Sequence, residues 1–367
     1  MSASTGVPYL DLSRQFEETR EQWFAAIRGA GETGSFILGP QCQAFEREFA
    51  AAVGTAHAIG VANGTDALEL SLRALDIGTG DEVITSPYTF FATAEAVTRV
   101  GATPVFADIE AGSFNLDPAS AAARITPRTK AILPVHIFGH PADMTALGEL
   151  ARRHGLALVE DCAQAYGARH AGRAVGSFGS TGCFSFYPTK VLGCFGDGGM
   201  ITTSDDALDA KIRKLRNHGA TAPFMHDTIG CNSRLDEVQA AVLRLKLARI
   251  DRDIAGRLRV ADAYDARLRG TAATSPPRPE NGAHVFNLYT IRIPERDRVR
   301  ARLTERGIGS SLCYPLGLHL QEVYRGLGYR AGDLPVADQA SREALSLPIY
   351  PELNETQVER VCASLWA

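Results

Sequence analysis

The alternation of seven short apolar runs with helical patterns restricts the fold of this 367-residue chain more than any other feature. Short apolar runs bounded by turn residues are typical of buried β-strands, and the stretches between them repeat their apolar residues at helical spacing. This alternation predicts a mostly parallel sheet covered by helices on both faces, with right-handed crossovers. The candidate strands are residues 57–62, 82–86, 104–107, 130–136, 156–160, 183–187 and 200–203, and the helices expected between them are 66–75, 91–100, 144–154 and 207–216.

Helical patterns also flank the predicted sheet along the chain. Two helices are expected before the first strand, at residues 15–29 and 43–53, and a long amphipathic stretch runs from Arg234 toward Tyr264. Residues 1–250 are therefore predicted to form a large α/β domain, in which a mostly parallel seven-stranded sheet is sandwiched by helices.

The C-terminal part of the chain has a different pattern. Prolines within residues 276–279 interrupt the helical periodicity. After them, a strand-like stretch at 285–293 is followed by a helical stretch at 298–306. We predict a smaller α+β domain over residues 251–367, with a boundary that is good to about ten residues.

Composition and charge exclude several classes of function. The formal net charge is −4 at pH 7, so the charge balance does not favour nucleic acid or an anionic membrane surface as a partner. The sequence has no secretion signal at its start and no run of about eighteen apolar residues, which leads us to expect a cytoplasmic protein without a membrane partner. The seven cysteines are odd in number and include no Cys-x-x-Cys pair, so we predict reduced thiols and no metal site.

Residues 181–199 contain the strongest candidate for a catalytic group. An apolar run from Cys183 to Tyr187 ends at Pro188 and is followed at once by Lys190, one of only five lysines in the chain. The other four fall in charged helical patterns or in a polar turn, where a solvated side chain is the ordinary interpretation. Burial lowers the pKa of an amine and makes it a nucleophile toward carbonyl groups. From spacing alone, a lysine that merely extends its ammonium group into solvent fits equally well.

Polar residues at the ends of two other predicted strands are candidates for cofactor contacts. Gly64, Thr65 and Asp66 lie between a strand and a helix, where free backbone N–H groups and the helix dipole favour a phosphate. The alternative is that Thr65 or Asp66 only caps the helix. Asp161 follows another apolar run, and a buried carboxylate there needs a cation such as a protonated pyridine ring, unless it also caps a helix. Gln164 is placed to hydrogen-bond a ring hydroxyl.

Four further residues give weaker signals. Ser185 is a hydroxyl within an apolar strand, so its partner is either a ligand phosphate or a backbone carbonyl. Phe90 follows the strand at 82–86 and either stacks on an aromatic ligand or belongs to the core. Asn232 precedes the long helical stretch and by default caps it, whereas Arg234 is able to hold a phosphate or carboxylate with two hydrogen bonds.

Together these signals resemble the fold type I enzymes that use pyridoxal 5′-phosphate. More closely, the chain resembles the DegT-type nucleotide-sugar aminotransferases over nearly its whole length. The stretches that carry the resemblance are Phe36-Ile37-Leu38-Gly39-Pro40, Asn63-Gly64-Thr65-Asp66-Ala67-Leu68, Gly80-Asp81-Glu82-Val83-Ile84-Thr85, Tyr88-Thr89-Phe90, Thr126-Pro127-Arg128-Thr129-Lys130-Ala131-Ile132, Glu160-Asp161-Cys162-Ala163-Gln164-Ala165, Ser185-Phe186-Tyr187-Pro188-Thr189-Lys190, Gly196-Asp197-Gly198-Gly199 and Asn232-Ser233-Arg234-Leu235-Asp236.

The resemblance implies a role for each candidate residue. Lys190 would bind the cofactor aldehyde covalently and shuttle protons, and Asp161 would pair with the pyridinium nitrogen. Gln164 would contact the ring hydroxyl, and Phe90 would cover one face of the ring. Gly64, Thr65, Asp66 and Ser185 would hold the cofactor phosphate. Asn232 of the partner subunit would hold it from the other side of the dimer interface. A homodimer with shared active sites is therefore implied.

The resemblance also implies the substrates. L-glutamate would donate the amino group, leaving 2-oxoglutarate, and a nucleotide-linked keto sugar would accept it. Relatives with the same sequence around Asp161 and before Lys190 act on 3-keto sugars, so we expect a 3-keto rather than a 4-keto substrate. The residues expected to face the sugar are Tyr187, Arg234, Tyr314 and His319.

One departure from the family pattern concerns sugar recognition. Many members have His-Tyr-Pro where this chain has Cys313-Tyr314-Pro315. The missing imidazole leaves the exact sugar open but leaves the amine chemistry intact.

Two other activities are weighed against transamination. A dehydratase of the same family would replace the lysine by histidine or need an iron–sulfur partner, and Lys190 together with the missing cysteine cluster argues against it. A regulatory protein that binds pyridoxal phosphate without turnover would be favoured by basic DNA-binding segments, and none is visible in the sequence.

Overall fold

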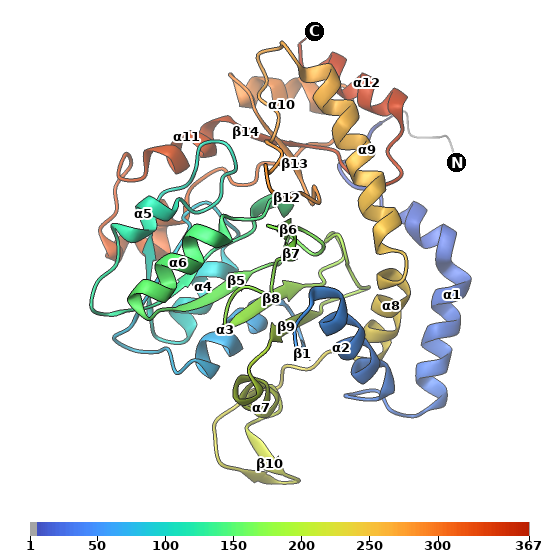
Figure 1. Ribbon diagram of the computed structural model, residues 1–367. Helices are drawn as coiled ribbons and strands as arrows, with labels where there is room; N and C mark the ends of the chain where they lie inside the picture. Colours follow the sequence, from blue (N-terminus) through green and yellow to red (C-terminus); the bar gives the residue numbers. More distant parts are fainter. Residues whose placement is uncertain (1–5, 367) are drawn as a thin grey trace.

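The seven apolar runs form the seven strands of one sheet. The structure, a computed structural model, describes residues 6–366. The strand order is β1-β9-β8-β5-β4-β2-β3 (Figure 1). β9 is antiparallel to both of its neighbours, and the remaining pairs are parallel, so the predicted mostly parallel seven-stranded sheet is confirmed. The strands are β1 (His57–Val61), β2 (Glu82–Thr85), β3 (Thr103–Phe106), β4 (Thr129–Leu133), β5 (Ala157–Asp161), β8 (Thr181–Ser185) and β9 (Gly199–Thr203).

Consecutive side chains of these strands enter two separate cores, which explains why the strands are apolar throughout. Cys183 of β8 packs into a core with α3, α4 and α7, whereas Phe184 packs on the opposite face with α2 and α8. Ile132 of β4 faces α5 and α6 on that second side. The helices are α2 (Pro40–Val53), α3 (Gly64–Ala74), α4 (Ala92–Arg99), α5 (Pro118–Ala122), α6 (Met144–His154), α7 (Asp206–Leu215) and α8 (Glu237–Leu247).

Helix α1 (Ser13–Glu32) lies outside these layers and packs along α8 (Figure 1). The long amphipathic stretch after Arg234 forms two helices, α8 and α9 (Ile250–Leu268), separated by a turn at residues 248–249. Glu237, at the start of α8, accepts hydrogen bonds from the N–H groups of Gln41 and Cys42 and so closes the N-terminus of α2. The buried carboxylate of Glu237 therefore links α2 to α8.

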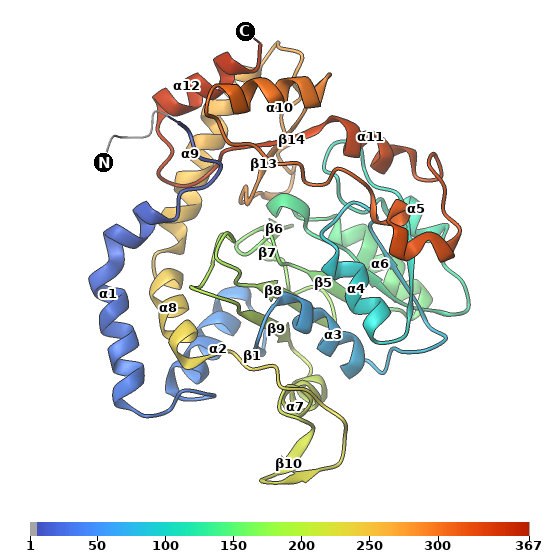
Figure 2. The same ribbon diagram turned by 180° about the vertical axis from the view of Figure 1, so that it is seen from behind.

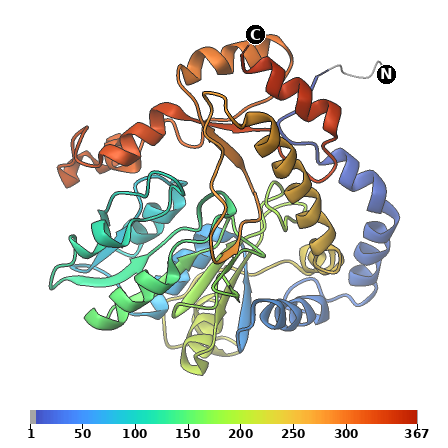
Figure 3. The ribbon, with the colours of Figure 1, turned by 45° about the horizontal axis from the view of Figure 1, so that its top comes forward.

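The C-terminal part has its own core, as expected for a smaller α+β unit. It is built on α9, the antiparallel pair β13 (Tyr289–Arg292) and β14 (Ala344–Leu347), and the helices α10 (Arg296–Glu305) and α12 (Glu355–Ser364). Val7 is buried in this core and pairs with Ile308, although the sequence assigned it to the large domain. Figures 2 and 3 show the segment between residue 6 and α1 lying beside the C-terminal part. The boundary near residue 250 stays a prediction.

Several short elements were not predicted. The strands β10 (Ala220–Ala222) and β11 (Met225–His226) form a hairpin that projects away from the body of the molecule (Figures 1 and 2). Phe224 and Met225 at its tip are 95% and 63% exposed, and Ile229 nearer its base is 85% exposed, so this hairpin has apolar side chains without intramolecular cover. The other short elements that were not predicted are the strands β6 (Arg169–His170), β7 (Arg173–Ala174) and β12 (Gly282–Ala283), the 3₁₀ helices η1 (Ile137–Gly139), η2 (Leu318–Leu320) and η3 (Glu322–Leu327), and helix α11 (Pro335–Glu343). Within residues 6–366, no helix combines the length and apolar character that a membrane crossing requires.

Candidate active site

A pocket of about 540 Å³ lies at the carboxyl ends of the parallel strands, where open α/β sheets bind their ligands. Its volume falls within the range of roughly 300–1,000 Å³ that is typical of ligand sites. The segments that follow β1, β2, β4, β5 and β8 line it, together with Tyr314 from the C-terminal part. The predicted residues that line it are Gly64, Thr65, Phe90, Asp161, Gln164, Ser185, Tyr187, Lys190 and Tyr314.

Lys190 and Asp161 are the charged pair at the centre of this pocket. Burial lowers the pKa of Lys190, and Asp161 offsets part of that effect. Burial likewise raises the pKa of Asp161, against the hydrogen bonds it accepts from the Ala163 N–H (3.0 Å) and the Thr93 hydroxyl (2.8 Å). A buried carboxylate with a raised pKa is stabilised by a second cation, and an amine with a lowered pKa is available as a nucleophile. The pair therefore suits an aldehyde ligand that also carries a basic ring nitrogen.

The turn between β1 and α3 brings backbone N–H groups to the pocket. Asn63 is the N-cap of α3, and its side-chain oxygen accepts the N–H of Asp66 at 2.8 Å. The Asp66 N–H is thus engaged with Asn63, and Asp66 lies outside the pocket lining, so its contact with a phosphate stays a prediction. The first N–H groups of a helix have no partner within it, which leaves those of Gly64 and Thr65 for a ligand.

Ser185 completes this cradle from the end of β8. Its hydroxyl oxygen accepts the Tyr187 N–H at 3.3 Å, so its hydrogen is free to be donated. A Cβ at position 64 would lie 2.7 Å from the Ser185 Cβ, so only glycine allows the turn and the strand to approach this closely. A small anion between the two segments would contact donors from both.

Gln164 and Tyr314 form the wall beside Asp161. The Gln164 side-chain oxygen accepts the Phe138 N–H at 2.8 Å, and its nitrogen donates to the Tyr314 hydroxyl at 2.9 Å. One N–H of the amide remains for a ring hydroxyl. Tyr88, which sequence reasoning passed over, accepts the Tyr314 N–H and donates to the Cys313 carbonyl, and so fixes this segment of the C-terminal part.

Two aromatic side chains stand at the mouth of the pocket. Phe90 is 59% exposed and Tyr187 is 52% exposed, although both line it. Exposed aromatic rings beside a concave site are available to stack on a flat ligand. The pocket also contains polar residues that the sequence did not single out, namely Asn63, Thr89, Thr93, Thr189 and Asp197. Asn63, Thr89, Thr189 and Asp197 lie in stretches that carry the family resemblance, whereas Thr93 lies outside them.

The remaining predicted residues lie outside the pocket of their own chain. Asn232 is exposed at the base of the β10–β11 hairpin, where it pairs with Asn217, and Arg234 donates to the Asn217 side chain. Asn232 does not cap α8, because the N-cap of that helix is Asp236. His319 is buried beneath the surface with its ring 3.1 Å from Asp338, so it is not placed to face a sugar in this structure.

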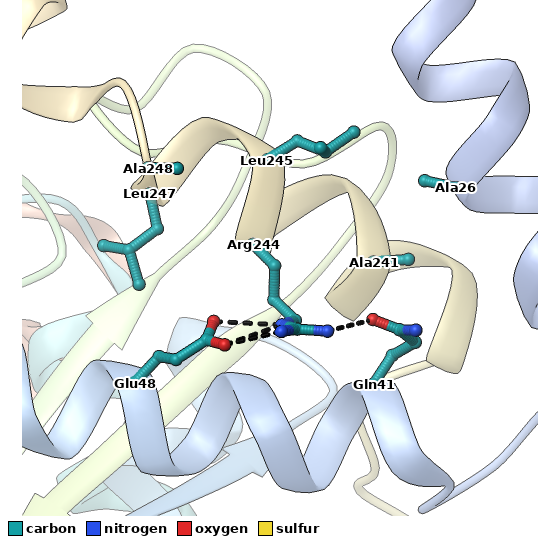
Figure 4. Close-up of a pocket in the computed structure, with 8 residues that line it drawn as sticks. All are labelled: Ala26, Gln41, Glu48, Ala241, Arg244, Leu245, Leu247 and Ala248. Carbon is teal, nitrogen blue, oxygen red and sulfur yellow. Dashed lines mark hydrogen bonds and ion pairs between the residues drawn. The ribbon is translucent and has the colours of Figure 1, made fainter.

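A second pocket, of about 430 Å³, lies between α1, α2 and α8 (Figure 4). Arg244 projects into it and is held by the Glu48 carboxylate and by the side-chain oxygen of Gln41. The polar groups of this pocket satisfy one another, whereas Lys190 and Asp161 face an open volume. We therefore locate the chemistry in the pocket that contains Lys190.

Among residues 6–366, side chains able to ligate a metal gather at His136, Glu160 and Cys162. The His136 ring accepts the Ala142 N–H through Nδ1 and contacts Glu160 through Nε2 at 3.1 Å. Glu160 also accepts three backbone N–H groups. These hydrogen bonds occupy the ligating atoms of both residues, so the cluster is best explained as a structural anchor of β5.

A nucleophilic lysine, a buried acid and a phosphate cradle on successive strand ends define the class of pyridoxal-phosphate-dependent enzymes. Comparison with known proteins gives the family. Residues 17–366 match the DegT/DnrJ/EryC1/StrS aminotransferase family, and the chain belongs to it. The chain is therefore an aminotransferase whose cofactor is pyridoxal 5′-phosphate.

Three curated relatives match the chain along its length. The dTDP-3-amino-3,4,6-trideoxy-alpha-D-glucose transaminase of Streptomyces venezuelae is 47% identical over 98% of this chain and 96% of its own length. A 3-aminotransferase of UDP-N-acetyl-3-dehydro-alpha-D-glucosamine from Acidithiobacillus ferrooxidans is 46% identical over 98% and 97%. A protein of Geobacillus stearothermophilus named as a pleiotropic regulatory protein is also 46% identical, over 97% and 96%.

The fold matches solved structures equally well. The crystal structure of S. venezuelae DesV in complex with a ketimine intermediate superposes with a TM-score of 0.96 at 47% identity, over 98% of this chain and 97% of that one. The two-part fold predicted from the sequence is therefore that of a known aminotransferase.

Proposed function

We propose that this enzyme transfers the amino group of L-glutamate to the C3 keto group of a nucleotide-linked sugar. The observation that carries the proposal is the meeting of Lys190, Asp161 and the Gly64–Ser185 cradle in one pocket. The choice of C3 is supported by relatives at 46% and 47% identity whose names place the nitrogen at C3. Cys313 stands where many family members have histidine, and it does not indicate a particular sugar. The proposal therefore names neither the nucleotide nor the C2 and C6 substituents.

The residues of the pocket divide the chemistry among them. When bound, pyridoxal phosphate supplies an aldehyde for the amine and a ring that withdraws electrons from the reacting carbon. Asp161, ionised and buried, holds the proton of the ring nitrogen in place. Lys190 Nζ moves the proton between substrate and cofactor carbons, because it is the basic group beside them. Gly64, Thr65 and Ser185 anchor the phosphate, and Gln164 orients the ring through its remaining N–H.

We further propose that the working form is a homodimer. Among the residues that line the pocket, Lys190 is the only cation, while Asp161 and Asp197 are both acidic. A phosphate of charge about −1.5 to −2 and a nucleotide diphosphate require more positive charge and more donors than this. Asn232 and Arg234 lie outside their own pocket at the base of the projecting hairpin, and this position supports a role toward a partner subunit. The exposed apolar tip of the hairpin supports the same arrangement.

The cofactor chemistry is tested with L-glutamate alone. The enzyme is expected to convert its bound cofactor to the pyridoxamine form and to release one equivalent of 2-oxoglutarate. Lys190→Ala should abolish this conversion, whereas Lys130→Ala, which removes an exposed lysine far from the pocket, should leave it intact. A glutamate reaction that survives loss of Lys190 refutes the assignment.

The acceptor is tested by adding nucleotide-linked 3-keto and 4-keto sugars to the pyridoxamine form and following the return of the aldehyde form. Faster return with the 3-keto compounds supports the proposal, and faster return with the 4-keto compounds assigns the enzyme to C4. A protein that binds cofactor but reacts with neither glutamate nor sugars is a regulatory binder, the alternative suggested by the relative named for regulation.

The shared site is tested by mixing two inactive variants, Lys190→Ala and Asn232→Ala. If Asn232 serves the partner subunit, a mixed dimer contains one site with both residues intact, and activity returns on mixing. If both residues serve the same site, every site in the mixture is defective and activity stays absent.

A further inference from the structure

A chain of two buried hydroxyl groups ends on Asp161. The Thr93 hydroxyl lies 2.8 Å from Asp161 Oδ2, and the Thr89 hydroxyl lies 3.0 Å from that of Thr93. Thr89 comes from the turn after β2, and Thr93 from the first turn of α4. Both are almost fully buried, at 2% and 1% exposure, and both line the Lys190 pocket. The mechanism described above assigns no role to either hydroxyl.

The direction of these hydrogen bonds follows from the charge of Asp161. An ionised carboxylate only accepts, so the Thr93 hydroxyl must donate to it. Thr93 has then used its single hydrogen, and its oxygen accepts from Thr89. Thr89 is therefore the donor at the start of the chain. Each hydrogen bond polarises the next, so the bond from Thr93 to Asp161 is stronger than it would be alone.

The two oxygens of Asp161 are constrained from different sides. Oδ1 accepts the Ala163 N–H at 3.0 Å, which fixes one oxygen to its own strand end. Oδ2 is held by Thr93 from α4, a separate element. Without the Thr93 bond, only the Ala163 N–H would restrain the rotation of the carboxyl group about its last side-chain bond. Asp161 would also lose one of the two hydrogen-bond donors that favour its ionised form. Burial alone favours the neutral form.

We propose that Thr93, supported by Thr89, is a positioning residue that holds Asp161 ionised and in one orientation for the ring nitrogen of the cofactor. The inference rests on the proposed role of Asp161. It assigns a specific purpose to two hydroxyl groups at positions where apolar side chains of the same shape would pack equally well. The substrate-facing residues are not involved, so the effect is expected in cofactor binding and kcat rather than in KM for the sugar.

Isosteric substitutions separate this role from packing. Thr93→Val removes the hydroxyl and keeps the shape, Thr93→Ser keeps the hydroxyl and removes the methyl group, and Thr98→Val makes the same change on α4 away from the pocket. The readout is the dissociation constant of pyridoxal phosphate, obtained by titrating the apoprotein, together with kcat and KM. Thr93→Val is expected to weaken cofactor binding about tenfold to a hundredfold, the range for loss of a hydrogen bond to a charged group. Thr93→Ser should stay within about threefold of the wild type, and Thr98→Val should be unchanged.

The double variant tests whether the two hydroxyls act as a chain. Thr89→Val alone is expected to weaken cofactor binding by a few-fold, and to add nothing when Thr93 is already valine. An equal effect of Thr89→Val in both backgrounds overturns the chain. A Thr93→Ser variant as weak as Thr93→Val overturns the hydroxyl role in favour of packing, and wild-type binding by Thr93→Val overturns the proposal entirely.

Asp161→Asn distinguishes failure of this inference from failure of the proposed function. If Asp161→Asn lowers cofactor affinity and Thr93→Val does not, only the positioning role is refuted. If neither substitution changes cofactor affinity, the assignment of Asp161 as partner of the ring nitrogen is refuted as well.

Discussion

Substituting Gly64 by alanine is the most direct test of the phosphate cradle. The new Cβ would lie 2.7 Å from the Ser185 Cβ, and the two segments would have to separate by about 0.8 Å to reach an optimal carbon–carbon distance of about 3.5 Å. In the proposed cradle Gly64 and Ser185 donate to the phosphate from opposite sides, so this separation takes at least one of them out of hydrogen-bonding range. A hydrogen bond to a charged group contributes about 1.5–3 kcal/mol, which corresponds to about 10- to 150-fold in affinity.

The assay is a fluorescence titration of the apoprotein with pyridoxal phosphate, accompanied by urea unfolding of the same protein. Gly64→Ala is expected to weaken cofactor binding by the factor given above and to lower the free energy of unfolding by about 1–3 kcal/mol through overpacking. Gly148→Ala is the matched control, because a Cβ there meets no atom within 4 Å and the position lies inside α6. The control should raise the free energy of unfolding by about 0.5–1 kcal/mol and leave cofactor affinity unchanged. Wild-type cofactor affinity in Gly64→Ala would refute the cradle.

Three further substitutions test other parts of the structure by urea unfolding. Burial lowers the pKa of Lys246 to about 8, whereas the unfolded chain keeps this proton up to about pH 10.4. Between these two pH values the unfolded chain binds more protons, so the free energy of unfolding should rise with pH. Lys246→Met should flatten this rise. Arg216→Met removes one of the two arginine partners of the buried Glu46, which keeps Arg213 at 2.8 Å, and should cost about 1.5–3 kcal/mol at pH 7. This loss shrinks as the pH falls and the carboxylate is protonated. Tyr88→Phe removes the hydroxyl that links two backbone groups around Tyr314 and should cost about 1–3 kcal/mol, measured together with KM for the sugar.

The strands of the sheet were predictable because they are apolar on both faces. Every candidate run became a strand, displaced by at most a few residues, and the helices between them followed from their apolar spacing. The break between α8 and α9 was not marked, since residues 248–249 include neither glycine nor proline. The β10–β11 hairpin lacks the alternation of a half-buried strand because most of its side chains face solvent. The position of Val7 depends on a contact with Ile308, which no local pattern in sequence reveals.

The candidate site was predictable for residues whose position in the sequence alone brings them to the pocket. Lys190, Ser185 and Gln164 follow from their position after apolar runs, since strand ends of a parallel sheet converge. Competition between neighbours was not predictable. Asn63, Thr65 and Asp66 are all polar residues at the start of α3, and only the structure shows that Asn63 supplies the cap and thereby occupies the N–H of Asp66. His319 illustrates the same limit, because nothing in the local sequence indicates the buried Asp338 beside it.

The adjacent carboxylates Glu160 and Asp161 show how the fold turns similar residues to different uses. They point to opposite faces of β5, because side chains alternate along a strand. Glu160 meets three backbone N–H groups and the His136 ring, which satisfy a buried carboxylate completely.

Asp161 receives only the Ala163 N–H and the Thr93 hydroxyl, and burial raises its pKa. The first residue is therefore expected to act on stability and the second on cofactor binding. Glu160→Gln should lower the free energy of unfolding by about 1.5–3 kcal/mol and change the cofactor affinity of the folded protein little. Asp161→Asn should lower the cofactor affinity and change the free energy of unfolding little. The neutral side chain is easier to bury, but it does not hold a charged ring nitrogen. Equal effects of the two substitutions on both quantities would contradict this division, which depends on how many donors the fold supplies to each oxygen.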